Sequence, residues 1–262
     1  MNNAPVYCTV AQIRFNPILC MESLLPSIQE QMRHNSFPDF HLENVQEILI
    51  PSGQQSDIAK PPSPSILQRI RGVFGNVDQT KEFVLENNFL ALQTTKYETF
   101  DDFLAELIKG LKIISDVVKP DFVERIGLRY FDAIQPKDGE SLDLYLNPRL
   151  LGLYNTKTGL HQHTFTETVI KTDACFVTSR IMIRRGQIGL PMEIANLMEK
   201  VETRFKHNKE SLHAILDTDT FSSVRINQFD LNAIEKKLHE LHKEQKNAFD
   251  AVVTPTAKEK WQ

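Results

Sequence analysis

The stretch HQHTFTE at residues 161–167 holds side chains suited to binding a metal ion. Side chains on a β-strand alternate between its two faces, so His161, His163 and Glu167 would share one face. Two imidazoles and a carboxylate can hold iron, manganese or zinc. The alternative is a polar, exposed strand face with hydrogen-bonded histidines. We favour this alternative and expect no metal site, because such histidine groups often occur without a metal.

A pair of carboxylates, Asp217 and Asp219, follows the apolar run at residues 212–216. Paired carboxylates at the end of a strand can hold a divalent ion for phosphoryl chemistry. The sequence has no Walker loop, no GxGxxG motif and no basic residue beside the pair. Asp-Thr-Asp-Thr also suits a turn, in which these side chains satisfy the local backbone. We therefore predict a turn here and no bound cofactor.

Arginines recur at spacings that place two side chains on the same face of a strand. Guanidinium groups gathered on a sheet can bind phosphates or carboxylates through two parallel hydrogen bonds. The alternative, which we favour, is ion pairing across the sheet with Glu82, Glu86, Glu124 or Glu167. A further pair with this spacing is Arg69 and Arg71. The best candidates for a binding surface are Arg125, Arg129, Arg180 and Arg184.

No catalytic motif accompanies these residues. The segment HELH at 239–242 differs from the HExxH motif of zinc proteases, because its histidines are three residues apart. The serines and cysteines lie in no known nucleophile motif. We therefore expect a non-enzymatic recognition protein that binds a protein partner or an anionic ligand. The alternative is a metal- or phosphate-handling enzyme that uses His161, His163 and Glu167 or the Asp217/Asp219 pair.

The composition is typical of a globular protein, with 41% hydrophobic and 24% charged residues among 262. A net charge of −4 gives no overall attraction to nucleic acid, although the arginines can bind it locally. No apolar run reaches the roughly 18 residues of a membrane-spanning helix, and no signal peptide is visible. Cys8, Cys20 and Cys175 show no metal or disulfide spacing. We expect a cytoplasmic protein that is not membrane-bound and can form homo-oligomers.

Hydrophobic periodicity predicts an α+β fold. Strands are predicted at 7–15, 47–50, 66–74, 82–86, 89–94, 122–131, 161–170, 175–185 and 212–216. Helices are predicted at 23–33, at 100–117 with Thr99 as its cap, and from Leu231 onward with Asp230 as its cap. The segment 51–65, rich in proline and serine, is predicted to be a surface loop.

Two segments repeat one order of features: an apolar strand, a polar loop and a long amphipathic helix. They are LALQTTKYETFDDFLAELIKGL and HAILDTDTFSSVRINQFDLNAIEKKLHEL. The repetition indicates two related halves, each with a helix laid on antiparallel strands. We predict an antiparallel sheet with amphipathic helices on one face. Its halves are residues 1–135 and 136–262, or the chain is one continuous unit.

The strand RIGLRY at Arg125–Tyr130 resembles that of a sporadically distributed family of uncharacterised bacterial proteins. The segment LQTTKY before it, and Leu241, His242 and Phe249 after it, add to the resemblance. The resemblance covers most of the chain and implies no catalytic residues. The scattered distribution of the family implies an accessory role, such as antiphage defence or a toxin-linked module.

Overall fold

The computed structural model describes residues 4–49, 65–153, 159–206 and 211–262. In these ranges the strands are β1 (Val6–Phe15), β2 (Asp39–Leu49), β3 (Ser65–Gly75), β4 (Lys81–Glu86), β5 (Phe89–Thr94), β6 (Val123–Ile134), β7 (His163–Lys171), β8 (Phe176–Arg185) and β9 (Leu212–Ser222). The helices are α1 (Met21–His34), α2 (Phe100–Val117), α3 (Leu231–Val252) and α4 (Pro255–Lys260). Short 3-10 helices are η1 (Leu142–Leu144), η2 (Pro148–Leu150), η3 (Met192–Lys200) and η4 (Thr203–Phe205). The predicted loop 51–65 lies outside the described residues, apart from Ser65 at the start of β3.

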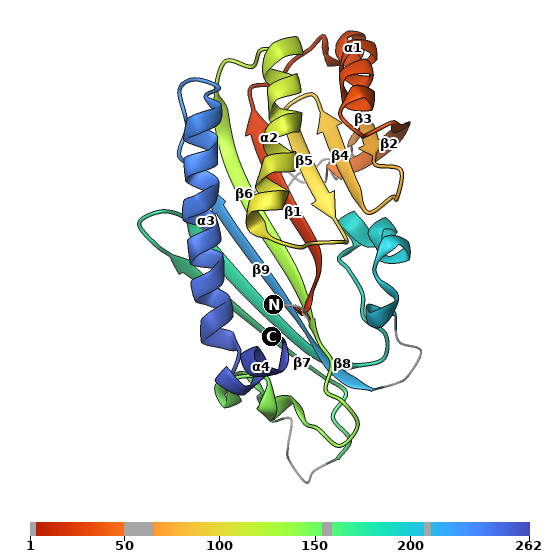
Figure 1. Cartoon of the computed structure of the whole chain (residues 1–262). Coiled ribbons are helices and arrows are strands. Elements are labelled where there is room, and N and C mark those ends of the chain that lie inside the picture. Colours follow the sequence, from red (N-terminus) through yellow and green to blue (C-terminus); the bar gives the residue numbers. More distant parts are fainter. Residues whose placement is uncertain (1–3, 50–64, 154–158, 207–210) are drawn as a thin grey trace, which may run out of the picture.

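The nine described strands form one antiparallel sheet in the order β2-β3-β4-β5-β1-β6-β9-β8-β7. Helices α1, α2 and α3 lie across one face of this sheet (Figure 1). The predicted fold class, α+β with helices on an antiparallel sheet, is confirmed.

Among the described helices, none combines the length and the apolar character needed to cross a membrane.

The strand order repeats outward from the central pair of β1 and β6. On one side β1 is followed by β5, β4 and β3, and on the other side β6 is followed by β9, β8 and β7. Helix α2 follows β5 along the chain, as α3 follows β9. Residues 1–135 contribute β1 to β6, including both central strands, and residues 136–262 contribute β7 to β9. Their description as two related halves stays a prediction.

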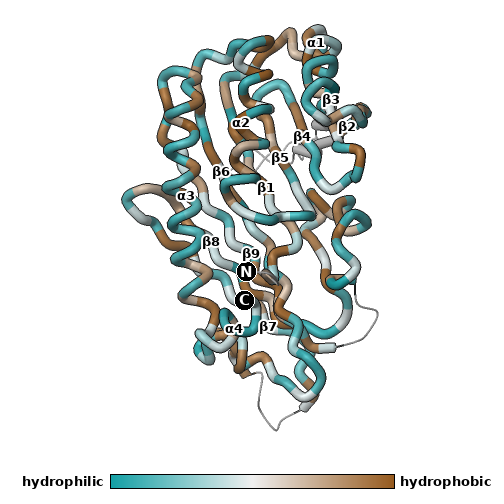
Figure 2. The backbone as a smooth tube through the Cα atoms, viewed as in Figure 1, coloured by the Kyte–Doolittle hydropathy of each residue, from teal (hydrophilic) through white to brown (hydrophobic). Residues whose placement is uncertain are grey.

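The two long helices bury the apolar stripes seen in the sequence. Thr99 caps α2, because its hydroxyl accepts a hydrogen bond from the backbone N–H of Asp102 at 3.1 Å. Leu107 on α2 and Leu238 on α3 are fully buried in the same apolar cluster. Figure 2 shows hydrophobic and hydrophilic residues alternating along both helices. This periodicity is typical of a helix that packs one face against a sheet and exposes the other face to water.

Strands β2 and β9 extend furthest beyond their predicted bounds. Strand β2 begins at Asp39, eight positions before the predicted start at 47, and pairs with β3 along its whole length. Strand β9 continues to Ser222, so Asp217 and Asp219 lie within a strand and the predicted turn is wrong. The polar residues misled the prediction because backbone pairing with β6 and β8 on either side holds this segment extended.

A row of hydroxyl side chains crosses the helix-covered face between two apolar clusters. Thr9, Tyr130, Thr218 and Ser179 are successive cross-strand neighbours on β1, β6, β9 and β8. Asp132 lies beside this row on β6. On one side of it, Tyr130 belongs to the apolar cluster that includes Leu107 and Leu238. On the other side, Ile134 belongs to the cluster that includes Trp261. Its carboxylate is buried, and within the described ranges it makes no hydrogen bond or ion pair. Burial raises the pKa of Asp132 to about 7.

We expect Leu107→Ala and Leu238→Ala each to lower the free energy of unfolding by about 2–5 kcal/mol, because each removes a buried side chain from a packed core. Leu19, which is 93% exposed, provides the control, and Leu19→Ala should change stability by less than about 0.5 kcal/mol. Urea denaturation measures the three values. A small loss at both core positions would show that the helix stripes do not form the core.

Asp132 should make the protein less stable as the pH rises from about 4 to about 7. In this window the native state keeps the Asp132 proton, whereas the unfolded chain, with its ordinary pKa, has released it. Asp132→Asn should remove this dependence, so its stability relative to the wild type should grow by about 3–4 kcal/mol between pH 4 and pH 8. Denaturation at several pH values measures this difference. Asp116→Asn, on the exposed side of α2, is the control, and an unchanging Asp132→Asn difference would contradict the account.

Candidate functional site

The candidate site residues lie on the sheet face opposite α1, α2 and α3. Ile126 and Leu128 of β6 pack under the helices, so Arg125 and Arg129 point to the other face. The same alternation on β8 puts Arg180 and Arg184 on that face, because Ile181 and Ile183 are in the core beneath α3. We call this side the open face. The four predicted arginines therefore share one face of the sheet.

Strand β9 separates the two arginine pairs. It lies between β6 and β8, and it presents Asp217 and Asp219 to the open face. Arg129 is directly opposite Asp219, and Arg180 is directly opposite Asp217. The arginines thus do not form one continuous cationic surface. A strand of carboxylates runs between them.

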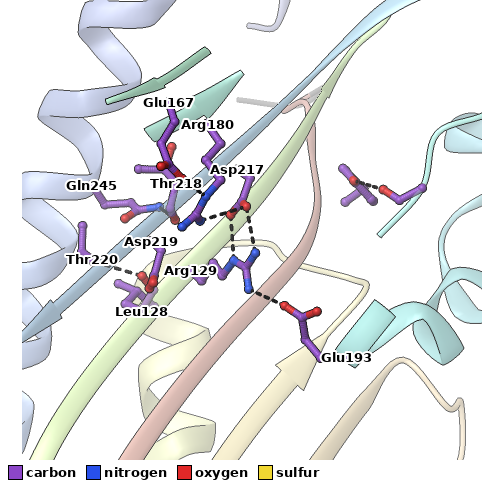
Figure 3. Close-up of polar contacts among 12 residues, drawn as sticks. Leu128, Arg129, Glu167, Arg180, Glu193, Asp217, Thr218, Asp219, Thr220 and Gln245 are labelled. Carbon is purple, nitrogen blue, oxygen red and sulfur yellow. Dashed lines mark hydrogen bonds and ion pairs between the residues drawn. The ribbon is translucent and has the colours of Figure 1, made fainter. Parts of the chain in front are cut away.

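Asp217 is the centre of an ion-pair network (Figure 3). Arg129 donates from Nε and Nη2 to its two carboxylate oxygens at 2.7 and 2.8 Å. Arg180 approaches the same carboxylate at 3.3 Å and also donates to Glu167 at 2.6 Å. Arg129 uses its remaining terminal nitrogen to contact Glu193 at 3.0 Å. These contacts occupy Arg129 and Arg180 with protein carboxylates, as the ion-pairing interpretation predicts for Glu167.

Arg71 is held in a similar way. Its Nε and Nη2 atoms donate to one oxygen of Glu86 at 3.0 and 2.7 Å, and Glu86 is buried. Arg69 lies 3.5 Å from the other oxygen of the same carboxylate. This confirms Glu86 as a cross-strand partner, which was one of the four acidic residues considered from the sequence.

Arg125 has weaker partners than Arg129. It donates to Gln12 at 3.3 Å, lies 3.9 Å from Asp219 and stacks 4.6 Å above the Phe221 ring. Its direct neighbour on β1 is another arginine, Arg14. Burial lowers the pKa of Arg125 below its ordinary value; Asp219 offsets part of this effect and Arg14 adds to it.

Arg14 was missed in the sequence analysis. It is half-buried, and its Nε atom is enclosed without a hydrogen-bond partner in the part of the chain that the structure describes. Its neighbours on the two adjacent strands are Phe89 and Arg125, so neither supplies a carboxylate. The alternation of the strand at 7–15 places Arg14 on a wetter face with Gln12. Its pairing with Arg125 depends on the β1–β6 register, which the sequence does not state.

A pocket of about 220 Å³ opens on the face beside Arg125. Its polar lining includes Arg71, Arg125, Arg129 and Asp219, and its apolar wall is formed by Val84, Phe89 and Ala91. These three apolar residues form a small buried cluster of their own on the open face. We call this the Arg125 pocket. It combines an arginine whose charge is only partly balanced with an apolar wall.

His163 and Glu167 share one face of β7, as predicted, but His161 does not join them. His161 lies before the start of β7, and its Nε2 atom contacts the hydroxyl of Thr164 at 2.8 Å. Glu167 is engaged by Arg180. Across residues 4–49, 65–153, 159–206 and 211–262, no three His, Cys, Asp or Glu side chains are placed to hold a metal ion together.

The Asp217/Asp219 pair does have basic partners, contrary to the sequence analysis. They come from β6 and β8, which are distant in the sequence but adjacent in the sheet. Because Arg129 and Arg180 occupy the Asp217 oxygens, the pair is arranged as a counter-charge for arginines and not as an open cation site. Glu193 was also missed, since the segment that carries it has no regular strand or helix pattern.

His242 on α3 is packed against aromatic side chains. Its ring stacks on Phe100 at 3.9 Å between centroids, and its Nδ1 atom lies 3.3 Å from the hydroxyl of Tyr130. Burial lowers the pKa of His242, and the nearby His239 lowers it further. This histidine faces the core and does not contribute to the open face.

Neither a protein-family model nor a curated protein matches the sequence. The resemblance seen in RIGLRY therefore stays a prediction.

Asp217→Asn should lower the free energy of unfolding by about 2 kcal/mol or more, because it leaves two half-buried guanidinium groups without their shared counter-charge. Glu193→Gln is a matched control: it removes the other carboxylate on Arg129, but that side chain is 61% exposed. Its effect should be below about 1 kcal/mol. Chemical denaturation of both variants measures the contrast. Equal losses would show that the Asp217 network is not the main support of these strands.

Proposed function

We propose that the protein is a non-enzymatic recognition protein that binds an anionic group of a ligand or protein partner on its open sheet face. The proposed contacts are Arg125, which lines the Arg125 pocket, and Arg14, its direct neighbour on β1. The observation that carries the proposal is the placement of two arginine residues directly opposite one another on β1 and β6, with only Asp219, 3.9 Å from Arg125, as a nearby carboxylate.

Like charges opposite one another on adjacent strands destabilise a sheet. A buried N–H group without an acceptor adds a further cost of about 1–3 kcal/mol. At Arg14 both costs occur together, since its Nε has no acceptor in the described ranges and its neighbour is Arg125. A bound carboxylate or phosphate would offset both, because its oxygens accept hydrogen bonds from each guanidinium group.

The rest of the pocket indicates an anion attached to an organic body. Phe89, Ala91 and Val84 offer apolar contact next to the charged pair. An inorganic ion would use only the guanidinium groups. A carboxylate or phosphate on a side chain or small molecule would also cover this apolar wall and exclude water from it.

The cellular setting is proposed on separate grounds. Cys8, Cys20 and Cys175 are free thiols, which supports a reducing compartment such as the cytoplasm. The resemblance to sporadically distributed bacterial proteins supports an accessory role, for example in antiphage defence or beside a toxin. In such a role, the bound anion would belong to a protein partner, a nucleic acid or a small ligand, and the protein can act as a homo-oligomer.

Phosphate should raise the melting temperature of the wild type at constant ionic strength, because an ion that binds only the folded state stabilises it by mass action. Arg125→Gln and Arg14→Gln should lose most of this increase. Arg33→Gln, a change of the same kind at an exposed position on α1, should keep it. Differential scanning calorimetry, with chloride replacing phosphate at equal ionic strength, measures the effect.

The two substitutions also separate a binding role from a structural one. Without phosphate, Arg14→Gln and Arg125→Gln should leave stability unchanged or raise it, because they relieve repulsion. A loss of more than about 1 kcal/mol together with an undiminished phosphate effect would show that the pair supports the fold and does not bind the anion.

A further inference from the structure

A second pocket, of about 310 Å³, lies on the open face near the edge of the sheet. It is bordered by β8, β9 and the segment before η3, and Arg129 lines both this pocket and the Arg125 pocket. Its apolar lining comprises Phe131, Phe165, Met182, Leu190, Pro191 and Ile215. We call it the Phe165 pocket.

The Phe165 pocket has apolar side chains at its floor and at its opening, and its charged lining residues are Arg129, Arg180, Arg184 and Asp217. Phe131 is fully buried at the sheet, and Ile215 is 8% exposed. Phe165, on the edge strand β7, is 55% exposed at the opening. Water gains few hydrogen bonds in such a space, so displacing it with an apolar ligand is favourable. The shape and the lining suit an aliphatic chain.

Arg184 supplies a positive charge to the same pocket. It makes no hydrogen bond or ion pair within the described part of the chain, unlike Arg180 four residues earlier on the same face. Its direct neighbours are His163 on β7 and His213 on β9, so neither adjacent strand places a carboxylate opposite it. A half-buried guanidinium group in these surroundings has its donors available for an anion.

We propose that the Phe165 pocket binds an aliphatic carboxylate, with its chain against Phe165 and Met182 and its carboxylate on Arg184. A carboxylate matches the planar fork of one guanidinium group and carries the single negative charge that one arginine balances. The volume of the pocket is at the lower end of the range of about 300–1,000 Å³ that is typical of small-molecule sites. A short or medium chain therefore fits better than a large ligand.

This proposal is independent of the Arg14 and Arg125 contacts. The Arg129–Glu193 ion pair lies where the two pockets meet, and the proposed anion contacts belong to different strands, β1 and β6 in one case and β8 in the other. Either proposal can fail while the other holds. Phosphate binding and Arg125→Gln test the Arg125 pocket, whereas octanoate binding and Arg184→Gln test the Phe165 pocket.

The test is octanoate binding to the full chain, followed by methyl NMR of ¹³C-labelled methionine. The chain has six methionines, and the Met182 methyl reports from inside the Phe165 pocket, whereas Met32 is buried on the helix side and serves as the internal control. Octanoate should shift the Met182 signal and leave Met32 unchanged. Met182→Leu assigns the signal.

Substitutions and ligand analogues separate the charge from the chain. Arg184→Gln should weaken octanoate binding roughly 10-fold to 100-fold, as expected for loss of hydrogen bonds between charged groups. Arg33→Gln, at an exposed position on α1, should leave it unchanged. Octanol keeps the chain and acetate keeps the charge, so both should bind more weakly than octanoate. A shift of Met182 that is equal for octanol, or unaffected by Arg184→Gln, would overturn the carboxylate assignment.

The same assay distinguishes two natural sources of an aliphatic carboxylate, a polypeptide C-terminus and a free fatty acid. A short peptide ending in leucine presents an aliphatic side chain beside a free carboxylate, and its amidated form removes the charge. Tighter binding of the free peptide than of octanoate would identify a polypeptide C-terminus as the source, whereas the reverse would identify a free fatty acid. If neither ligand shifts Met182, or if Met182 is instead shielded by self-association of the chain, the proposal is wrong.

Discussion

The antiparallel pairing of β1 with β6 is the interaction on which the rest of the structure depends. This central pair joins the strands β2, β3, β4 and β5 on one side to β9, β8 and β7 on the other. Its register decides which side chains face the helices. Ala11 and Leu128 pair on the buried side, and Arg14 and Arg125 pair on the open side. A shift by one residue would exchange the two faces, placing charge in the core and apolar residues in water. The core and the candidate binding surface are therefore fixed by the same hydrogen bonds.

On the open face, most arginines are balanced by carboxylates of a neighbouring strand. Strand β9 brings Asp217 between arginines of β6 and β8, and Glu86 of β4 does the same for arginines of β3. Where η3 and the segment before it cover the centre of this face, apolar residues such as Ile194 and Leu197 complete a small core. The two pockets lie where that cover ends, so each has an apolar wall on one side and an arginine without full compensation on the other.

The sequence predicted what depends on local pattern. The Thr99 cap, the Leu107 and Leu238 stripes and most strands follow from periods of 3.6 and 2 and from capping chemistry. It did not predict what depends on strand order. Asp217 looked like a turn residue because its arginine partners are far away in the chain, and Arg14 looked unremarkable until β6 placed Arg125 opposite it. His161 was assigned to a strand, but β7 begins two residues later, at His163.

The position of β1 also has a consequence for synthesis on the ribosome, where the chain emerges from its N-terminus. Strand β1 is made first among the described strands, yet both of its neighbours come much later: Thr9 pairs with Thr94 of β5 and Tyr130 of β6. Until residue 134 has emerged, this strand, apolar over much of its length, has unpaired edges. Contacts so distant in sequence form slowly, and exposed strands of this kind aggregate or recruit chaperones. The nascent chain is therefore most prone to aggregation before β6 has paired with β1.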